Sequence, residues 1–348
     1  MTDELCAKQI SQLITPNMLI SSFPLSAVMK ENILKARQRI GNILCGNDPR
    51  LLVIIGPCSI HDVDAALDYA RRLNLLRIKY QSRLEIVMRT YFEKPRSIAG
   101  WRGLIADPGI DNSFRINDGL KIARQLLLAI NTLGLPSATE FLDIIIGQYI
   151  IDLISWGAIG ARTAESQVHR AMASAMPCPI GFKNNTDGNI QIAINAIRAA
   201  RSSHFFLSQN KKGQITAYRT KGNKHGHIIM RGGAVPNYQK QDITNACIQL
   251  ASFGLPSHLL VDFSHGNCQK QYLHQLKVAH SLCEQLQSNH RQIVGVMIES
   301  NLVEGNQKPF SDLPLIYGQS VTDACLGWDD TEQLIILLNK MVSCRFNR

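Results

Sequence analysis

The amino-acid sequence predicts an α/β protein, a (β/α)8 TIM barrel with an N-terminal extension and an inserted β-hairpin. From residue 51 onward, short apolar runs alternate with amphipathic helical segments, which is the pattern of repeated βα units around a parallel sheet. There are eight such runs, the number that a closed barrel requires. The length of 348 residues, 45% of them hydrophobic, is sufficient to bury a large core.

The predicted elements alternate along the chain. Strands are expected at residues 51–57, 85–91, 137–142, 158–161, 179–182, 227–230, 259–263 and 293–298. Helices are expected at residues 65–80, 119–132, 149–155, 166–174, 190–201, 242–253, 269–287 and 331–342. We expect residues 1–47 to form an extension with an oligomeric or regulatory role and residues 48–348 to form the catalytic barrel. Residues 204–220 alternate in polarity around a Lys-Lys-Gly turn, which predicts the hairpin.

The composition argues against several classes of protein. No apolar run is long enough to span a bilayer and the N-terminus lacks the order of a signal peptide, so we expect a cytoplasmic protein without a membrane partner. The nine cysteines include no CxxC pair, which argues against a zinc ribbon or a disulfide framework. The net charge is +10, but the basic residues form no long block, which favours small anionic ligands over nucleic acid.

Cationic residues gather after one predicted strand. The segment 86–103 begins as an apolar run and then carries Arg89, Lys94, Arg96, Ser97 and Arg102. An unpaired charge at the edge of a core costs roughly several kcal/mol, so positive groups that converge there indicate an anionic ligand. An exposed loop with solvated charges is the alternative interpretation of this stretch taken alone.

A residue capable of chemistry also stands at or near the end of each predicted strand. These residues are Cys58, Arg89, Glu140, Arg162, Lys183, Arg231, His265 and Glu299. Because the carboxyl ends of all eight strands of a barrel surround one pocket, residues far apart in the sequence are expected to meet there. Each residue alone has an ordinary structural explanation, such as a core thiol or a helix cap. Their shared position at strand ends favours a common site.

These residues divide into two sets by their chemistry. Five cations form an anion-binding set, namely Arg89, Lys94, Arg162, Lys183 and Arg231. The second set contains Cys58, His265, Glu299 and Asp323, a mixture of soft and hard ligands that suits a divalent ion such as Mn, Fe, Co or Zn. His61 and Cys325 are rival ligands that the spacing alone does not exclude. There is no Walker A or GxGxxG motif, so nucleotide binding is not indicated.

Seven motifs resemble those of the microbial type I 3-deoxy-D-arabino-heptulosonate 7-phosphate synthases. They are GPCSIHD at 56–62, MRTYFEKPR at 88–96, SWGAIGART at 155–163, GFKN at 181–184, IIMRGG at 228–233, DFSHGN at 262–267 and ESNLVEGNQ at 299–307. The resemblance runs nearly end to end. It implies a metal-dependent barrel, a homodimer or homotetramer, that condenses phosphoenolpyruvate with erythrose 4-phosphate at the entry to aromatic amino-acid synthesis.

The resemblance also implies roles for individual residues. By motif, the metal ligands are Cys58, His265, Glu299 and Asp323, and the phosphoenolpyruvate site consists of Arg89, Lys94, Arg162, Lys183 and Arg231, with Glu140 close by. Arg96, Ser97 and Arg102 belong to the erythrose 4-phosphate site. Lys94 is the expected proton donor to the aldehyde. The family commonly has threonine at Ser97, lysine at Arg102 and glycine at Asn185, and we expect the site geometry to survive these changes.

Other stretches are most similar to the tryptophan-sensitive branch of the family, which implies tryptophan as an inhibitor. The effector pocket implied by the resemblance contains Ile144, Gln148, Pro177, Phe206 and Ser208. Pro177 replaces the serine that is typical of the family, so one hydrogen bond to the effector is expected to be missing.

Two alternative functions are weighed against this one. A sister enzyme would condense phosphoenolpyruvate with arabinose 5-phosphate on the same fold, but the KPR run at 94–96 favours the four-carbon sugar. A basic nucleic-acid-binding protein would instead bind DNA with an affinity that falls steeply as salt increases.

Overall fold

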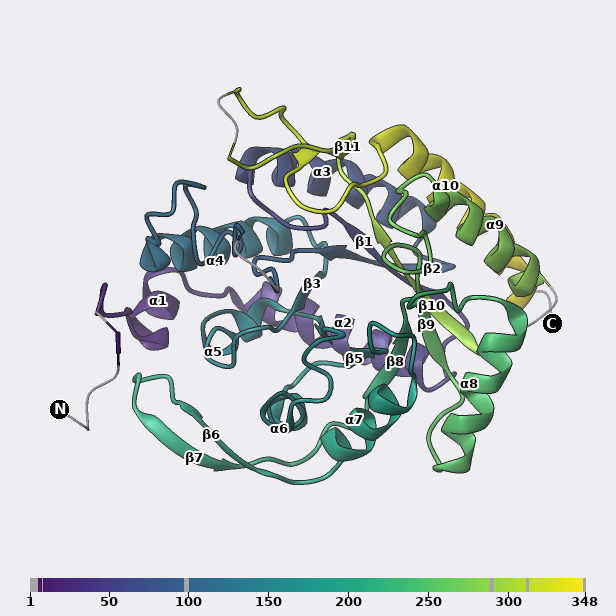
Figure 1. Cartoon of the computed structure of the whole chain (residues 1–348), viewed down its shortest axis with the longest axis horizontal. Coiled ribbons are helices and arrows are strands. Elements are labelled where there is room, and N and C mark those ends of the chain that lie inside the picture. The colour runs from purple at the N-terminus through teal and green to yellow at the C-terminus, as the bar shows by residue number, and fades with distance from the viewer. Residues whose placement is uncertain (1–5, 8, 97–99, 288–290, 311–312, 347–348) are drawn as a thin grey trace.

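Eight parallel strands close into a barrel in the computed structural model, which describes residues 6–7, 9–96, 100–287, 291–310 and 313–346 (Figure 1). Around the barrel the order is β1-β10-β9-β8-β5-β4-β3-β2, and every neighbouring pair is parallel. The strands are β1 (Leu51–Gly56), β2 (Leu84–Arg89), β3 (Ser137–Glu140), β4 (Trp156–Ile159), β5 (Ile180–Lys183), β8 (His227–Met230), β9 (Leu259–Asp262) and β10 (Ile293–Glu299). The predicted fold class is confirmed.

Helices surround the barrel and cover its outer face (Figure 1). They are α3 (Val63–Tyr80), α4 (Ile116–Thr132), α5 (Gly147–Ile150), α6 (Gln167–Ala175), α7 (Gln191–Arg201), α8 (Lys240–Ser252), α9 (His274–Gln287) and α10 (Trp328–Val342). Polar side chains begin several of them, since Asp62 accepts the Ala65 N–H at the start of α3 and Ser166 accepts the His169 N–H at the start of α6. Their apolar residues pack in the same core as the strands.

Two helices of the N-terminal extension precede the barrel, α1 (Pro16–Ser22) and α2 (Ala27–Leu44). Ile40, Ile43 and Leu44 of α2 join a hydrophobic cluster with strand residues from the barrel interior. Arg39 of α2 forms an ion pair of 2.8 Å with Glu85, near the start of β2. Helix α2 therefore covers the end of the barrel at which the strands begin, and the strands end on the opposite face.

The inserted hairpin lies between α7 and β8. Its strands β6 (Phe205–Gln209) and β7 (Ile215–Arg219) pair in antiparallel register and curve past α6 and α5 (Figure 1). Phe206 and Ser208 are buried, whereas the side chains of Phe205 and Leu207, which alternate with them along β6, are exposed. The alternation of the sequence therefore corresponds to two faces of the hairpin, one of them against the protein.

Some predicted boundaries are wrong. The helix expected from residue 269 begins at His274, because Gln269 and Lys270 adopt left-handed backbone conformations with φ of 52° and 62°. The helix expected at 149–155 is replaced by short α5 and a 3-10 turn at Ile151–Leu153, and β4 begins at Trp156 because Trp156 pairs with Ala138 of β3. A small sheet of β11 (Val303–Asn306) and β12 (Gln319–Ser320) was not expected. A last 3-10 turn covers Ser343–Arg345.

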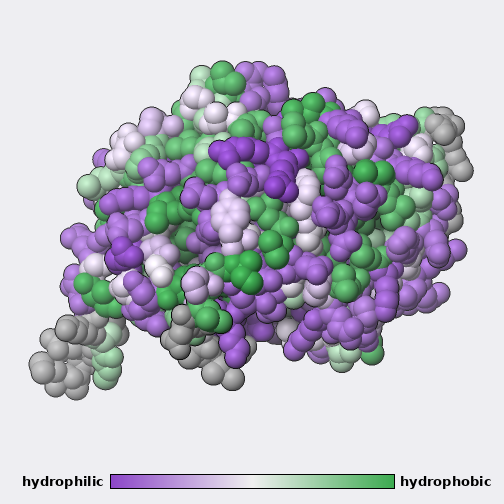
Figure 2. Space-filling view, turned by 90° about the horizontal axis from the view of Figure 1, so that it is seen from above, coloured by the Kyte–Doolittle hydropathy of each residue, from purple (hydrophilic) through white to green (hydrophobic). Residues whose placement is uncertain are grey.

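Hydrophilic and hydrophobic side chains are interspersed over the face of the molecule that Figure 2 shows. Within the described part of the chain, no helix combines the length and the apolar character that crossing a membrane requires.

Candidate active site

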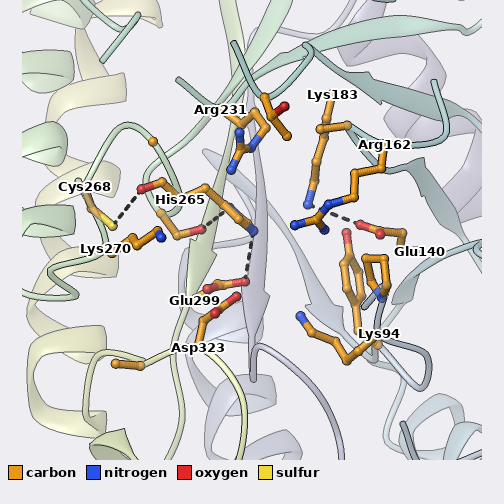
Figure 3. Close-up of a pocket in the computed structure, with 18 of the residues that line it drawn as sticks. Lys94, Glu140, Arg162, Lys183, Arg231, His265, Cys268, Lys270, Glu299 and Asp323 are labelled. Atoms are coloured by element: carbon orange, nitrogen blue, oxygen red, sulfur yellow. Dashed lines mark hydrogen bonds and ion pairs between the residues drawn. The ribbon is translucent and has the colours of Figure 1, made fainter. Parts of the chain in front are cut away.

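The end of the barrel at which the strands finish holds a cavity of about 870 Å³ (Figure 3). Gly56, Arg89, Glu140, Lys183 and Glu299 are the last residues of their strands. The cavity is lined by ten of the predicted residues, namely Arg89, Lys94, Arg96, Glu140, Arg162, Lys183, Arg231, His265, Glu299 and Asp323. The barrel thus brings together side chains from all parts of the sequence, as the strand-end argument requires.

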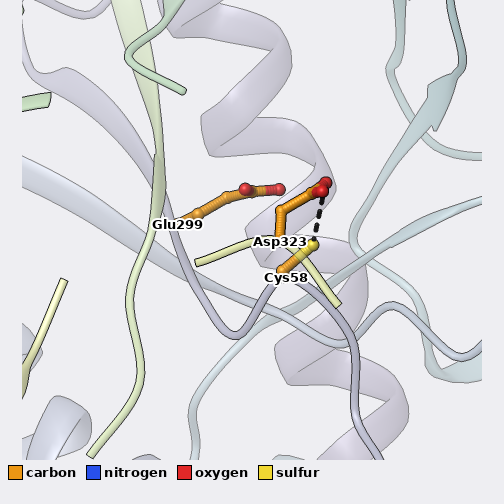
Figure 4. Close-up of side chains that lie close together, drawn as sticks. All are labelled: Cys58, Glu299 and Asp323. Atoms are coloured by element: carbon orange, nitrogen blue, oxygen red, sulfur yellow. Dashed lines mark hydrogen bonds between the residues drawn. The ribbon is translucent and has the colours of Figure 1, made fainter. Parts of the chain in front are cut away.

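Three potential metal ligands form a cluster (Figure 4), in which Glu299 and Asp323 line the cavity, whereas Cys58 is fully buried and is not among the lining residues. The Cys58 sulfur and one carboxylate oxygen each of Glu299 and Asp323 all lie within 4.8 Å of one another. The Cys58 thiol donates a hydrogen bond of 3.4 Å to Asp323 Oδ2. His265 Nε2 lies 3.7 Å from Glu299 Oε1, so the imidazole faces the same cluster. One thiol, one imidazole and two carboxylates can hold a divalent cation of the borderline class.

His61 and Cys325, the two alternative metal ligands, make other contacts in the structure. The His61 ring packs edge-on against Trp101, with 6.5 Å between ring centroids, and the Cys325 thiol donates a hydrogen bond of 3.6 Å to the backbone oxygen of Asp323. Among the described residues, the group of ligand atoms within 4.8 Å contains none of the three residues His61, Cys325 and His265. Of these, His265 has its Nε2 3.7 Å from Glu299 Oε1.

The electrostatics of the cluster reflect its negative charge. Burial, with a further contribution from Glu299, raises the pKa of Cys58 to about 12. Burial opposes ionisation of Asp323 as well, but Lys94 and His265 lower the pKa of this carboxyl to about 2. Lys94 Nζ lies 3.0 Å from the Cys58 sulfur and supplies positive charge to the group. A cation among these ligands would stabilise the thiolate, so the donor set fits a metal site.

His265 is held by a carboxylate behind it. Asp262, the last residue of β9, is fully buried, and its Oδ2 lies 2.9 Å from His265 Nδ1. His265 itself has a left-handed backbone with φ of 59°. Ser264 Oγ lies 2.7 Å from the same Nδ1 and donates a hydrogen bond of 2.6 Å to Asp262 Oδ1. The carboxylate and this hydroxyl together fix which imidazole nitrogen faces Glu299, which is an arrangement that metal-binding histidines commonly have.

The opposite wall of the cavity is cationic. The side chains of Arg162, Lys183 and Arg231 point into it (Figure 3). Lys183 Nζ lies 3.2 Å from Glu140 Oε2 and 4.0 Å from Asp262 Oδ2. Although burial opposes the ionisation of Glu140, Lys183, Lys94 and Arg89 lower the pKa of this carboxyl. A ligand with a phosphate or a carboxylate would neutralise the excess positive charge on this wall.

Arg89 differs from the other cations in that its guanidinium contacts Glu299 and Tyr91 within the protein. Its side chain is fully buried, and Nη2 forms an ion pair of 3.0 Å with Glu299. The guanidinium lies over the Tyr91 ring, 3.7 Å from its centroid. Arg89 therefore orients Glu299 in this structure as well as lining the cavity.

The remaining predicted residues fall into three groups. Arg102 is exposed and is not among the residues that line the cavity, and Ser97 lies outside the described residues. The implied effector residues Ile144, Gln148, Pro177, Phe206 and Ser208 lie away from the cavity, around α5, before β5 and on β6.

The sequence did not predict three further residues of the site. Tyr91 and Lys270 line the cavity, and Asp262 contacts His265. A signal existed for Asp262, which precedes the histidine by three residues at a strand end.

Comparison with known proteins identifies the family. The sequence pattern of the DAHP synthetase I family matches residues 26–335. This chain belongs to the DAHP synthetase I family. It is 59% identical over 344 residues to a protein from Enterobacter agglomerans, with 99% of both chains covered, and that protein is named phospho-2-dehydro-3-deoxyheptonate aldolase, Trp-sensitive. A protein from Escherichia coli K12 with the same name is 59% identical over 345 residues, again with 99% of each chain covered.

Solved structures agree with this membership of the DAHP synthetase I family. The structure of phospho-2-dehydro-3-deoxyheptonate aldolase from Francisella tularensis SCHU S4 superposes with a TM-score of 0.95 at 46% identity, and covers 97% of this chain and 99% of its own. The predicted family, the barrel and the class of enzyme are confirmed. The roles of individual site residues stay predictions.

Proposed function

We propose that this chain condenses phosphoenolpyruvate with D-erythrose 4-phosphate and water, giving 3-deoxy-D-arabino-heptulosonate 7-phosphate and phosphate. This reaction is the first step of the shikimate pathway, which leads to chorismate and the aromatic amino acids. The names of the relatives support this activity. The observation that carries the proposal is the cavity itself, in which a cluster of metal-ligand type faces a cationic wall.

Phosphoenolpyruvate would lie against the cationic wall. Arg162, Lys183 and Arg231 come from the ends of three successive barrel strands and can hold its phosphate and carboxylate. Arginine suits this task because its planar guanidinium binds an oxyanion through two parallel hydrogen bonds. The wall thereby orients C3 of phosphoenolpyruvate toward the centre of the cavity, where the aldehyde carbon of the second substrate must lie for the new carbon–carbon bond to form.

The ligand cluster would hold the metal. Cys58, His265, Glu299 and Asp323 are the proposed ligands, and the mixture of sulfur, nitrogen and oxygen favours Mn, Fe, Co or Zn. When bound, such an ion supplies Lewis-acid polarisation of the aldehyde oxygen. Asp262 keeps the His265 ring turned toward the cluster, and Arg89 keeps Glu299 in place.

Lys94 would donate the proton in this reaction. Its ammonium group lies next to the Cys58 sulfur at the edge of the cluster and also lines the cavity. Burial alone would lower the pKa of Lys94, but the surrounding Cys58, Asp323 and Glu299 raise it, so the side chain carries its proton. Lys94 can therefore protonate the aldehyde oxygen as C3 attacks, while water adds at C2 and phosphate leaves.

Erythrose 4-phosphate is the proposed acceptor, with arabinose 5-phosphate as the competing candidate. The Arg96 side chain reaches the cavity and donates a hydrogen bond of 2.9 Å to the Trp101 backbone oxygen, which fixes a cation near the mouth. Together with Ser97 it would bind the phosphate of the four-carbon sugar. Comparing the two aldose phosphates as substrates tests this choice, and preference for arabinose 5-phosphate would reject the proposed acceptor.

Tryptophan is the proposed inhibitor, and its pocket would lie between α5, the segment before β5 and the hairpin. The relatives' names include the words Trp-sensitive. The hydroxyl of Ser208 is buried without a hydrogen-bond partner in the described structure, so it could bind the effector. Ile144, Gln148, Pro177 and Phe206 would complete this pocket, with weaker binding because of Pro177.

The enzyme would also form a homodimer or homotetramer through the outer face of its hairpin. Phe205, Leu207 and Ile215 are 78%, 66% and 77% exposed and come from paired strands. Such an apolar face is typical of a subunit contact.

We propose a cytoplasmic location, which the unpaired state of the nine cysteines supports. No nucleic-acid or membrane partner is proposed.

A further inference from the structure

Glu93 stands beside Lys94 but has no role in the site described so far. It lies in the segment between β2 and α4, where the neighbouring Phe92 is buried. Glu93 Oε1 accepts a hydrogen bond of 3.3 Å from the backbone N–H of Asp143. This bond joins the Lys94 loop to the loop that follows β3, across a sequence separation of 50 residues.

The Asp143 side of this contact continues toward the hairpin. Asp143 Oδ1 accepts a hydrogen bond of 2.7 Å from the Ile145 N–H, and Gln209 Nε2 at the end of β6 donates to the Ile145 oxygen at 3.5 Å. In the same region, Lys211 Nζ donates to the Gln148 oxygen. A series of direct contacts therefore runs from the hairpin, through residues 143–148, to Glu93.

The Lys94 side of the contact ends at the proposed metal ligands. Lys94 Nζ lies 3.0 Å from the Cys58 sulfur, while the Lys94 backbone N–H donates to the Arg102 oxygen at 3.1 Å. Because Glu93 and Lys94 are adjacent, a shift of the backbone at Glu93 moves the ammonium group relative to the cavity. A displacement of about 1 Å at a reacting group can reduce a rate about 100-fold.

We infer that Glu93 is a positioning residue for Lys94, and that its contact with Asp143 couples the position of Lys94 to the segment that carries Ile144 and Gln148. This inference rests on the proposed function. Glu93 is not among the residues that line the cavity and acts through the backbone of its neighbour. A change around α5 would reach the cavity through the contact between Glu93 and Asp143.

The charge state of Glu93 should influence this contact. Burial, together with the nearby Asp143 and Glu140 carboxylates, raises the pKa of Glu93 to about 8, although the backbone N–H groups of Asp143 and Leu142 oppose this rise. His169 borders the same loop, where its Nε2 lies 2.8 Å from the Leu142 oxygen. The neutral carboxyl fits between the two loops. Since the pKa is higher in the docked loop than in a released one, docking is favoured at low pH and weakens as the pH rises through about 8.

The test compares Glu93→Gln, which keeps the acceptor oxygen without a charge, with Glu93→Ala, which removes it. Glu165→Gln, at an exposed carboxylate of another strand-end loop, is the matched control. We expect Glu93→Ala to lower kcat about 100-fold with little change in either KM. Glu93→Gln should keep most of the activity at neutral pH and should lack the alkaline decline that the wild type shows near pH 8.

The outcomes separate this inference from the proposed function. If the wild type forms no heptulosonate phosphate, the proposed function fails. If the wild type is active, an unimpaired Glu93→Ala variant, or equal alkaline profiles for the wild type and Glu93→Gln, would overturn the positioning role. A titration of the Glu93 carboxyl by NMR adds a readout independent of activity. Its midpoint should move to lower pH in Asp143→Asn, and an unchanged midpoint would also overturn the role.

The coupling is measured with tryptophan. Glu93→Ala should bind tryptophan by calorimetry as the wild type does, whereas tryptophan should inhibit its residual activity about 10-fold less effectively. Undiminished inhibition of Glu93→Ala would overturn the coupling. A wild type that tryptophan does not inhibit would reject the proposed regulation.

Discussion

Asp262 Oδ2 lies 2.9 Å from His265 Nδ1, and this contact leaves Nε2 of the same ring facing Glu299. The carboxylate is fully buried at the end of β9, so it cannot rotate away without disturbing the barrel. Although burial opposes its ionisation, His265 and Lys183 lower the pKa of Asp262, and the group is charged at neutral pH. The orientation of a proposed metal ligand is thus held by Asp262 together with Ser264, whose Oγ lies 2.7 Å from the same ring nitrogen.

The first prediction concerns this orienting carboxylate. Asp262→Asn should weaken metal binding about 10- to 100-fold, because the amide no longer fixes the imidazole orientation or raises its basicity. Metal affinity is measured by competition with a fluorescent chelator, with thermal unfolding as the check on folding. Asp187→Asn, at an exposed position in another loop, is the control. Equal affinities for Asp262→Asn and the wild type would contradict the orienting role.

The second prediction separates two neighbouring cysteines. Cys58→Ser should lose most of its metal after dialysis, because a hydroxyl does not replace the charge and softness of a thiolate. Cys325→Ser should keep its metal, since the Cys325 thiol donates a hydrogen bond to the Asp323 backbone oxygen and does not belong to the ligand cluster among the described residues. Metal content per chain is the measurement. Loss of metal from both variants, or from Cys325→Ser alone, would refute the proposed ligand set.

The third prediction concerns communication between the hairpin and α5. Lys211 is partly buried and donates to the Gln148 oxygen, whereas its neighbour Lys212 is exposed at the turn. Lys211→Met should weaken inhibition by tryptophan about 10-fold without altering the uninhibited rate, because the contact holds the hairpin against the proposed effector pocket. Lys212→Met is the matched control. Inhibition curves that coincide for Lys211→Met and the wild type would exclude this contact from the regulation.

The fourth prediction concerns stability at acidic pH. His227 accepts a hydrogen bond of 3.1 Å from Trp156 Nε1, and burial lowers its pKa to about 4. The unfolded chain therefore binds a proton at higher pH than the folded protein does. The stability that neutral His227 contributes is fully present above about pH 6.5 and is lost as the pH falls through about 4.

This dependence amounts to about 3 kcal/mol in the free energy of unfolding. Chemical denaturation over this pH range should show a steeper loss for the wild type than for His227→Gln. His280→Gln, at an exposed histidine of α9, should behave as the wild type does. Parallel curves for the wild type and His227→Gln would show that His227 is not buried in its neutral form.

Much of the barrel was predictable because its strands are buried on both faces. Leu51–Gly56 and Ile293–Glu299 are continuous apolar runs that end in turn or charged residues, a signal that needs no alignment. The start of α9 was not predictable, because the left-handed backbone of Gln269 and Lys270 depends on the surrounding loops. β11 was missed since Val303–Asn306 is largely exposed and lacks an alternating pattern.

Many residues of the candidate active site were also predictable from the sequence, as the barrel strands were. Residues such as Lys183 and Glu299 end their strands, so the fold alone brings them to one face. Asp262 and Glu93 were not recognised because their roles depend on a contact with another segment, His265 in one case and Asp143 in the other. A sequence indicates which residues can do chemistry at strand ends, whereas the residues that orient them become visible only when loops are placed in space.

The most direct test of the central claim is the condensation reaction itself. Purified protein is treated with a chelator, then supplied with phosphoenolpyruvate and erythrose 4-phosphate, with and without added Mn, Fe, Co or Zn ions, and formation of the seven-carbon product is followed. We expect no product after chelation and restored activity with at least one of these ions, since Cys58, His265, Glu299 and Asp323 form the proposed metal site. Full activity after exhaustive chelation, or no condensation with any of the ions, would contradict the account.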